Sequence, residues 1–174
     1  MKNKNIKTKK FLSFLIAVVF MLSLMPLSFA ADEVTLSGDG SADNPYLIGT
    51  EAELIAFREA VRTDAANNEK VSTICAKLTD DIELTNAWRP IAASDRSCHY
   101  AGTIDGDGHT ISNMTSTFED VQGLVGEAGA GLVIKNLTVE GVYNLNSDQT
   151  YTGGFVGRTH GAISLINCIN KILF

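Results

Sequence analysis

The chain has 174 residues, of which 45% are hydrophobic and 20% are charged, a composition typical of a globular protein. Five of its 14 Lys and Arg residues and none of its 20 Asp and Glu residues lie in residues 1–30, so residues 31–174 carry a formal net charge of −11. Nucleic acids and anionic membranes are bound through basic patches, and this charge balance argues against both as partners.

Residues 1–30 have the three parts of a secretory signal peptide. Five lysines precede an apolar run over residues 11–25, and Ser28 and Ala30 place small side chains at positions −3 and −1 of a cleavage site. The run is shorter than the roughly 20 residues of a membrane-spanning helix. We therefore predict cleavage between Ala30 and Ala31, export from the cytoplasm and no membrane span in the mature chain.

Residues 31–70 are predicted to hold an initial strand and a capping helix. A turn at Asn44-Pro45 leads into a short apolar run, and Thr50 with Glu53 forms a capping box. Apolar residues then recur at helical spacing, at Leu54, Phe57 and Val61. This pattern predicts an amphipathic helix over residues 51–63, followed by a polar loop.

Residues 71–174 contain an internal repeat. Gly123-Leu124-Val125-Gly126 recurs 31 residues later as Gly154-Phe155-Val156-Gly157, and an asparagine follows ten residues after each copy, at Asn136 and Asn167. A period between 20 and 50 residues is typical of solenoids and propellers. We interpret the four glycines, Gly123, Gly126, Gly154 and Gly157, as the turns of the repeat.

The apolar alternation inside each copy slips at the asparagine, as at Ile134-Lys135-Asn136-Leu137. A strand changes faces in this way only at a bend, and asparagine tolerates the backbone angles of a corner. Ile111-Ser112-Asn113-Met114 has the same pattern and is interpreted as a third copy. Stacked coils would then align Asn113, Asn136 and Asn167 in a ladder beside a column of Met114, Leu137 and Cys168. We predict an all-β solenoid of the β-helix type, with a propeller as the second choice.

Several motifs in their order resemble the GLUG-motif proteins, which are secreted or wall-associated proteins of mainly Gram-positive bacteria. The similar segments cover nearly all of the mature chain and comprise residues 38–48, the capped helix, 77–84, 88–91, 101–111 and the two Gly-Leu/Phe-Val-Gly units. Such repeats also occur in some immunoglobulin A peptidases. The resemblance implies a right-handed parallel β-helix of the pectin-lyase type with an N-terminal helical cap, and a role in cell-surface display or adhesion.

The last residues depart from this family pattern. After Asn167-Cys168 such repeats continue through a turn into another coil, whereas residues 169–174 are apolar and end the chain. A solenoid needs a polar terminal cap. We therefore expect the chain to be a truncated piece of a longer protein.

Two carboxylates, Asp105 and Asp107, lie in a Gly- and Asp-rich turn that resembles a calcium loop. In an EF-hand the twelfth loop position is Glu, but here it is Met114, so we expect a turn, with loose calcium binding as the alternative and no other cofactor. Asp80 and Asp81 are adjacent in one strand and point to opposite faces. They cannot be the paired carboxylates of a polysaccharide hydrolase, which makes catalysis the less favoured function.

Histidines, cysteines and aromatic residues supply the remaining candidates. Cys98 and His99 with His109 would make a metal site, and Cys75 with Cys98 a disulfide; the alternative is that the three cysteines, Cys168 included, are small buried hydrophobes. Four aromatic residues would stack on sugar rings or else cap the core, namely Trp88, Tyr100, Tyr143 and Tyr151.

Two classes of function remain open for the chain. The first is a secreted, non-catalytic module that binds an extracellular glycan or a host or cell-surface protein. The second is part of a β-helical polysaccharide-degrading enzyme or the accessory region of a secreted peptidase.

Overall fold

The computed structural model describes residues 34–93, 98–115, 120–144 and 151–174. Contacts divide the chain into two units, Met1–Glu33 and Val34–Phe174, and the second unit holds every described residue. The predicted signal peptide and the cleavage site at Ala30 and Ala31 lie outside the described residues. Within the described part, no helix has both the length and the apolar character needed to cross a membrane.

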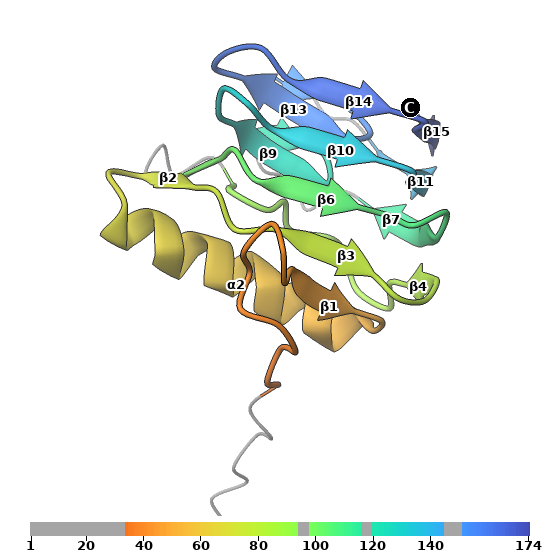
Figure 1. Ribbon diagram of the computed structural model, residues 1–174. Helices are drawn as coiled ribbons and strands as arrows, with labels where there is room; N and C mark the ends of the chain where they lie inside the picture. The colour runs from red at the N-terminus through yellow and green to blue at the C-terminus, as the bar shows by residue number, and fades with distance from the viewer. Residues whose placement is uncertain (1–33, 94–97, 116–119, 145–150) are drawn as a thin grey trace, which may run out of the picture. The chain divides into compact units, whose positions relative to one another are not determined.

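Helix α2 (Glu51–Asn67) begins at the predicted cap residue Thr50, although Glu53 reaches back to the residue before the cap. The Thr50 hydroxyl accepts the backbone N–H of Glu53 at 3.2 Å, and the Glu53 carboxylate accepts the N–H of Gly49 at 2.9 Å. The helix ends four residues later than predicted because Ala65 continues its buried face, which also holds Leu54, Phe57 and Val61. Figure 1 shows α2 lying across the end of the stack of strands, next to the paired strands β1 (Tyr46–Ile48) and β3 (Ala76–Leu78).

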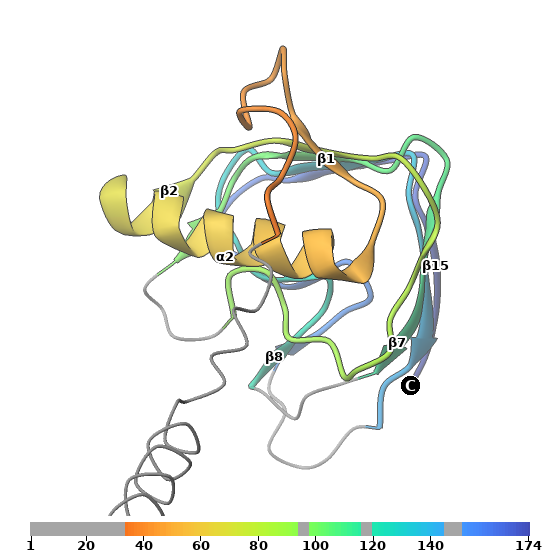
Figure 2. The ribbon, with the colours of Figure 1, turned by 90° about the horizontal axis from the view of Figure 1, so that it is seen from below.

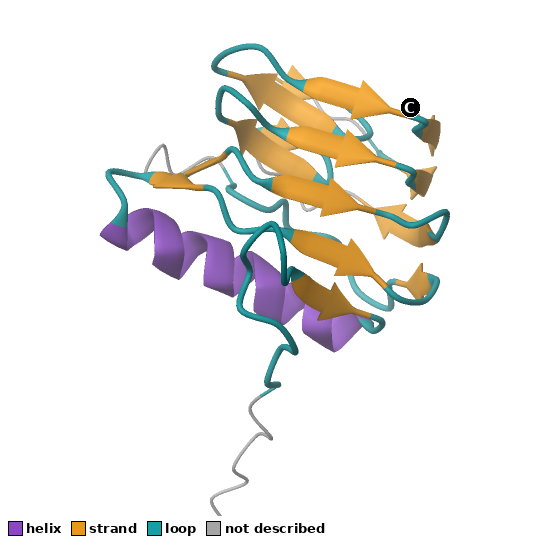
Figure 3. Ribbon diagram, viewed as in Figure 1, coloured by secondary structure: helices purple, strands orange, loops and turns teal. Residues whose placement is uncertain are grey.

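The strands form four parallel sheets, each named here by its first strand (Figure 3). The β1 sheet has five strands: β1, β3, β6 (Thr103–Asp105), β10 (Val133–Lys135) and β14 (Ser164–Ile166). The β2 sheet has β2 (Val71–Ser72), β5 (His99–Tyr100), β9 (Val125–Ala128) and β13 (Val156–Thr159). The β4 sheet has β4 (Ile82–Glu83), β7 (Thr110–Thr115), β11 (Thr138–Val142) and β15 (Ile169–Leu173). The β8 sheet pairs β8 (Val121–Gln122) with β12 (Tyr151–Thr152).

From β2 onward, successive segments of the chain visit the β2, β1 and β4 sheets in the same order, so each passage adds one strand to each of these three sheets; the last two passages also form the β8 sheet. Figure 2 shows the passages overlying one another when the molecule is seen from below. The predicted offset of 31 residues is the register of the last two passages: Val125 pairs with Val156, and Ile134 pairs with Leu165. The repeat in the sequence is therefore a repeat in space.

The core lies between the sheets and is covered at one end by α2. Phe57 of the helix makes edge-to-face contacts with Tyr46 and Tyr100, whose ring centroids lie 6.3 Å and 5.9 Å away. In the β1 sheet, Ile104 and Ile134 are fully covered by their neighbours. Leu165, the next residue of this column, is 47% exposed because it stands on the outermost strand of the sheet.

Candidate functional site

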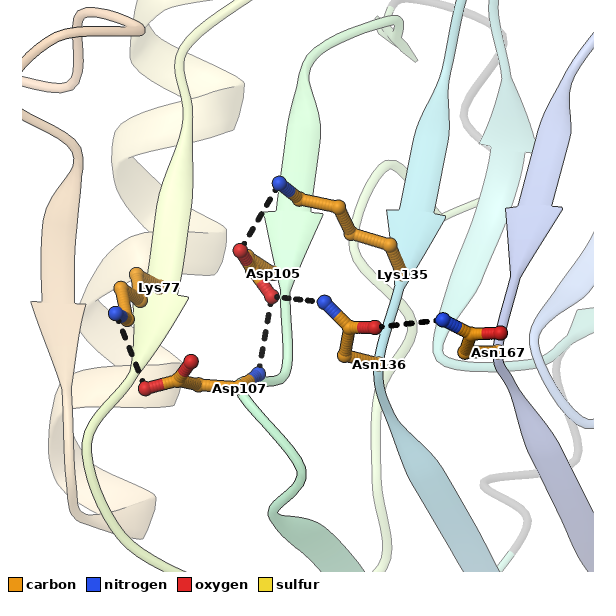
Figure 4. A network of polar contacts seen from close by, with 6 residues as sticks. All are labelled: Lys77, Asp105, Asp107, Lys135, Asn136 and Asn167. Carbon is orange, nitrogen blue, oxygen red and sulfur yellow. Dashed lines mark hydrogen bonds and ion pairs between the residues drawn. The ribbon is translucent and has the colours of Figure 1, made fainter.

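A row of polar side chains crosses the β1 sheet at the ends of β6, β10 and β14 (Figure 4). The Asn136 amide donates to the Asp105 carboxylate at 3.1 Å, and the Asn167 amide donates to the Asn136 side-chain oxygen at 3.2 Å. We call Asp105, Asn136 and Asn167 the polar ladder. The predicted pairing of Asn136 with Asn167 is present, and the third member of the polar ladder is Asp105.

Both asparagines of the ladder stand at corners between two strands. Asn136 and Asn167 each have a φ of 52°, the left-handed conformation that asparagine tolerates better than most residues. In the preceding passage the corner residue is Gly106, where a Cβ atom would lie 2.5 Å from the Asn136 carbonyl oxygen. The corner position thus requires a residue that tolerates a left-handed backbone conformation or a close approach of the neighbouring backbone.

The prediction that Asn113 belongs to this ladder is wrong. Asn113 lies within β7, where its amide donates to the Leu84 carbonyl oxygen at 2.6 Å. Strand β7 pairs with β11, so Ile111 is the partner of Val139 and Met114 is the partner of Gly141. The local pattern around Asn113 therefore reflects a bulge inside a strand, with φ of 58°, and the column of Met114 with Leu137 and Cys168 does not form.

The two aspartates of the predicted calcium turn face lysines. The Asp105 carboxylate contacts the Lys135 ammonium at 3.0 Å, and Asp107 contacts Lys77 at 3.0 Å (Figure 4). Partial burial raises the pKa of Asp105, but hydrogen bonds from Asn136 and from the backbone of Asp107, together with Lys135, outweigh it, so the pKa lies below 3.8. A calcium ion would have to displace both lysines, so this turn serves pairing between strands.

A hollow of about 250 Å³ lies beside the polar ladder, and its lining includes Lys77, Asp105 and Lys135. Pockets that enclose small molecules are usually larger, at roughly 300–1,000 Å³. The hollow has the dimensions of a surface groove, and its lining pairs two positive charges with one negative charge.

Three of the four aromatic candidates belong to the core, as the core-capping alternative predicts. Trp88 is 3% exposed and donates its indole N–H to the Leu124 carbonyl oxygen, and Tyr143 is 2% exposed. Tyr100 is fully buried, its hydroxyl donates to the Ile74 carbonyl oxygen, and burial raises its pKa well above 10. Only Tyr151 of this set is exposed, and the Arg158 guanidinium lies 4.9 Å from its ring centre.

The repeat glycines divide into two structural roles. Gly123 and Gly154 lie between strands, as predicted for turns, whereas Gly126 and Gly157 lie inside β9 and β13. At Gly126 a Cβ atom would lie 2.7 Å from the Ala92 carbonyl oxygen. The second glycine of each copy thus allows two backbones to approach closely, and the prediction that it forms a turn is wrong.

The three cysteines, all within the described residues, form no disulfide. Cys98 is buried, and Cys75 and Cys168 are partly exposed. The predicted alternative of small apolar side chains fits Cys98, whose sulfur lies 3.9 Å from the Val61 carbonyl oxygen.

The structure contains one cluster of chemically active side chains that the sequence patterns do not predict. His99 lies in β5, Glu127 lies in the neighbouring β9, and His160 directly follows β13; their potential ligand atoms all lie within 4.8 Å of one another. The Glu127 carboxylate lies 2.5 Å from Nε2 of His160 and 3.9 Å from the Arg158 guanidinium. We call these three residues the His-Glu-His cluster.

The electrostatics of this cluster depend on its burial. Glu127 is 1% exposed, although it carries a carboxylate. The rings of His99 and His160 stack with their centroids 4.2 Å apart. Burial and the neighbouring His160 lower the pKa of His99 below 6.5, in spite of the opposing effect of Glu127. The protonated form of His99 is therefore disfavoured.

Cys98, His99 and His109, which were considered as an alternative metal site, do not come together as a group. His109 instead contacts the Asp81 carboxylate at 3.3 Å, and Asp81 also accepts the backbone N–H of Thr110. No short sequence motif links His99 with Glu127 and His160. The register of the β2 sheet could have indicated the cluster, but the 31-residue repeat predicts this register only between the last two passages.

Comparison with known proteins finds two relatives. Halomucin from Haloquadratum walsbyi is 32% identical over 115 residues, which cover 65% of this chain and 1% of halomucin. A protein of Evansella cellulosilytica described as a Gly-rich membrane protein is 27% identical over an alignment of 176 positions, which cover 94% of this chain and 19% of that protein. No family model and no solved structure matches the chain. The chain thus spans only a small part of the length of the relatives it matches.

Proposed function

We propose that the chain is an extracellular, non-catalytic repeat module that adopts a right-handed parallel β-helix and presents its surface to a glycan or a protein. The observation that carries this proposal is the in-register stacking of successive passages in three sheets, with the polar ladder along one corner. Stacked repeats form stiff, extendable rods whose faces serve as binding surfaces. A right-handed winding is expected because parallel crossover connections are almost always right-handed.

Export and surface association are supported from two sides. The basic and apolar segments of residues 1–30 are typical of a secretory signal peptide. One relative is named halomucin and the other is described as a membrane protein, and both names suit proteins of the cell surface or its surroundings. The resemblance to GLUG-motif proteins leads to the same proposal of surface display.

The charged residues of the β1 sheet support binding over catalysis. Hydrolysis of a glycosidic bond needs two carboxyl groups that can reach the substrate, one of which gives up a proton. Asp105 and Asp107 are instead held by Lys135 and Lys77, and the pKa of Asp105 is lowered, which suits a permanent anion. The best accessible elements for a ligand are the groove beside the ladder and the exposed ring of Tyr151.

Secretion is tested by expressing the full chain in a bacterium and sequencing the N-terminus of the protein found in the culture medium. We expect a mature chain that starts at Ala31. A variant with Lys9 and Lys10 changed to Glu is the control, and it should accumulate inside the cell. Retention of the unmodified chain in the cytoplasm would contradict the proposal.

Binding and catalysis are separated by applying the secreted protein to a glycan array and, in parallel, to an assay for reducing sugars released from polysaccharides. We expect saturable retention on a subset of glycans or on a surface protein, without release of sugar. Tyr151→Ala tests the exposed ring, and Tyr143→Phe is the matched control because Tyr143 is buried. Sugar release that is lost in Asp105→Asn, with unchanged melting, would establish the enzyme instead.

A further inference from the structure

We propose that His99, Glu127 and His160 form a binding site for a divalent transition-metal ion of the zinc type. The site links three neighbouring strands of the β2 sheet. It does not depend on the proposed surface function.

The fold brings the three ligands together through the register of parallel strands. Tyr100 of β5 is the partner of Ala128 of β9, so His99 lies beside Glu127. Arg158 of β13 is the partner of Glu127, and His160 follows two residues later, on the same side of the chain. Glu127 is therefore flanked by His99 of β5 and by His160, which directly follows β13, and the backbone N–H of His160 donates to the Ala128 carbonyl oxygen at 2.8 Å.

Glu127 has the environment of a ligand carboxylate. A carboxylate that is 1% exposed is costly unless a cation or several hydrogen-bond donors compensate it. Its contacts are His160 at 2.5 Å and the Arg158 guanidinium at 3.9 Å, which is too long for a direct hydrogen bond. Arg158 also stacks over Tyr151, so its charge is shared with that ring. A bound divalent ion would compensate Glu127 directly.

The two imidazoles select the type of ion. A neutral imidazole nitrogen is a good ligand for zinc, copper and nickel, whereas calcium and magnesium prefer sites made of oxygen atoms. An imidazole binds a metal ion through the lone pair of its neutral form, and His99 and His160 each place a ring nitrogen within 4.8 Å of the other ligand atoms. The ligand set of two histidines and one glutamate leaves a fourth position for water.

Holding an ion requires the ligand atoms, which now lie within 4.8 Å of one another, to move by up to about 1.5 Å. Ligand atoms 2.0–2.1 Å from a tetrahedral zinc ion lie about 3.3 Å from one another. The Nε2 atom of His160 and the Glu127 oxygen are 2.5 Å apart, so they would separate by roughly 0.8 Å. The His160 side chain is 31% exposed and has room to move. Since Nε2 faces the carboxylate, it is the ligand atom, and the ring then keeps its remaining proton on Nδ1.

The test uses the full chain purified without an affinity tag and stripped of metal with a chelator. Thermal melting at pH 7.5 is recorded with zinc, calcium or no metal, and calorimetry measures the stoichiometry. A ligand that binds only the folded state raises the folding equilibrium constant about 100-fold at 100 times its Kd. We expect one zinc per chain and a melting point raised by zinc but not by calcium. Cobalt should give a visible absorption band of a four- or five-coordinate ion.

Three single variants locate the site: His99→Ala, Glu127→Gln and His160→Ala. Each should weaken zinc binding by more than the 10–100-fold that the loss of an outer-sphere partner costs. His109→Ala is the matched control, because that histidine pairs with Asp81 outside the cluster, and it should bind zinc normally.

The proposal fails if the unmodified chain shows no saturable zinc binding, or if His109→Ala loses as much affinity as His160→Ala. Glu127 is buried, so the Gln variant is interpreted only if its far-UV circular dichroism matches that of the unmodified chain. The two histidine variants and the cobalt spectrum decide the question in either case. None of these measurements depends on secretion or on glycan binding, so the two proposals can fail separately.

Discussion

Asn136 joins three neighbouring strands through its side chain while its own backbone adopts a left-handed conformation. Its amide donates to Asp105, its side-chain oxygen accepts from Asn167, and its φ is 52°. These two contributions, the side-chain bonds and the backbone tolerance, can be separated by comparing two substitutions. Asn136→Gly removes the side chain but keeps the tolerance for positive φ, and Asn136→Ala removes both.

We expect Asn136→Gly to lower the free energy of unfolding by about 2–3 kcal/mol. The bond to a charged carboxylate contributes about 1.5 kcal/mol and the bond to Asn167 about 0.5 kcal/mol, and glycine adds a few tenths through the entropy of the unfolded chain. Alanine in a left-handed conformation costs a further 1–2 kcal/mol, partly offset by its smaller unfolded-state entropy. Asn136→Ala should therefore be less stable than Asn136→Gly by about 1 kcal/mol.

Thermal unfolding followed by circular dichroism at pH 7 measures both differences. At about 4 °C per kcal/mol, the Gly variant should melt roughly 10 °C lower than the unmodified chain and the Ala variant roughly 14 °C lower. Equal melting of the two variants would refute the left-handed backbone at residue 136. A Gly variant that melts within about 1 °C of the unmodified chain would refute the contribution of the ladder.

Three further predictions concern other parts of the fold. Gly141→Ala should prevent folding or lower the melting point far more than Gly131→Ala, as soluble yield and thermal melting will show. A Cβ atom at residue 141 overlaps the Met114 backbone. Residue 131, at φ 97°, has open space around it, so Gly131→Ala should cost only about 1 kcal/mol. Thr50→Ala should cost about 1 kcal/mol in chemical unfolding through loss of the helix cap, and Thr50→Ser should retain most of it. Because the folded pKa of Asp105 is below 3.8, the stability that its carboxylate contributes is complete above that pH and is lost as the pH falls through the folded pKa. Asp105→Asn should reduce this acid sensitivity in a pH series of melting curves. Unchanged acid sensitivity would contradict the lowered pKa of Asp105.

Local signals predicted the helix and the repeat well. The helix begins at the predicted cap residue Thr50, because Thr50 and Glu53 satisfy backbone donors within four residues of the chain. Its end was predicted too early because alanines carry a weaker amphipathic signal than Val61. The 31-residue offset is the actual register of β9 with β13, because identical steps along the chain produce identical steps across a sheet.

The side-chain neighbours across the sheets were predicted less well. Asn113 and Asn136 share one local pattern, but a bulge between Val139 and Gly141 shifts the register of β7 and puts Asn113 inside a strand. Trp88 and Tyr143 were candidates for ligand binding and are buried. The sequence pattern does not distinguish an aromatic residue that faces the core from one that faces a ligand.

The sequence by itself determined the start of α2, the period of the last two passages and the positions where asparagine takes a left-handed corner. These properties depend on residues near one another in the chain. Only the tertiary structure decided which residues share a row across the sheets. The His-Glu-His cluster shows the physical reason: its members are separated by segments of unequal length, since the loops between passages differ, and the pairing of β5, β9 and β13 alone brings them within 4.8 Å.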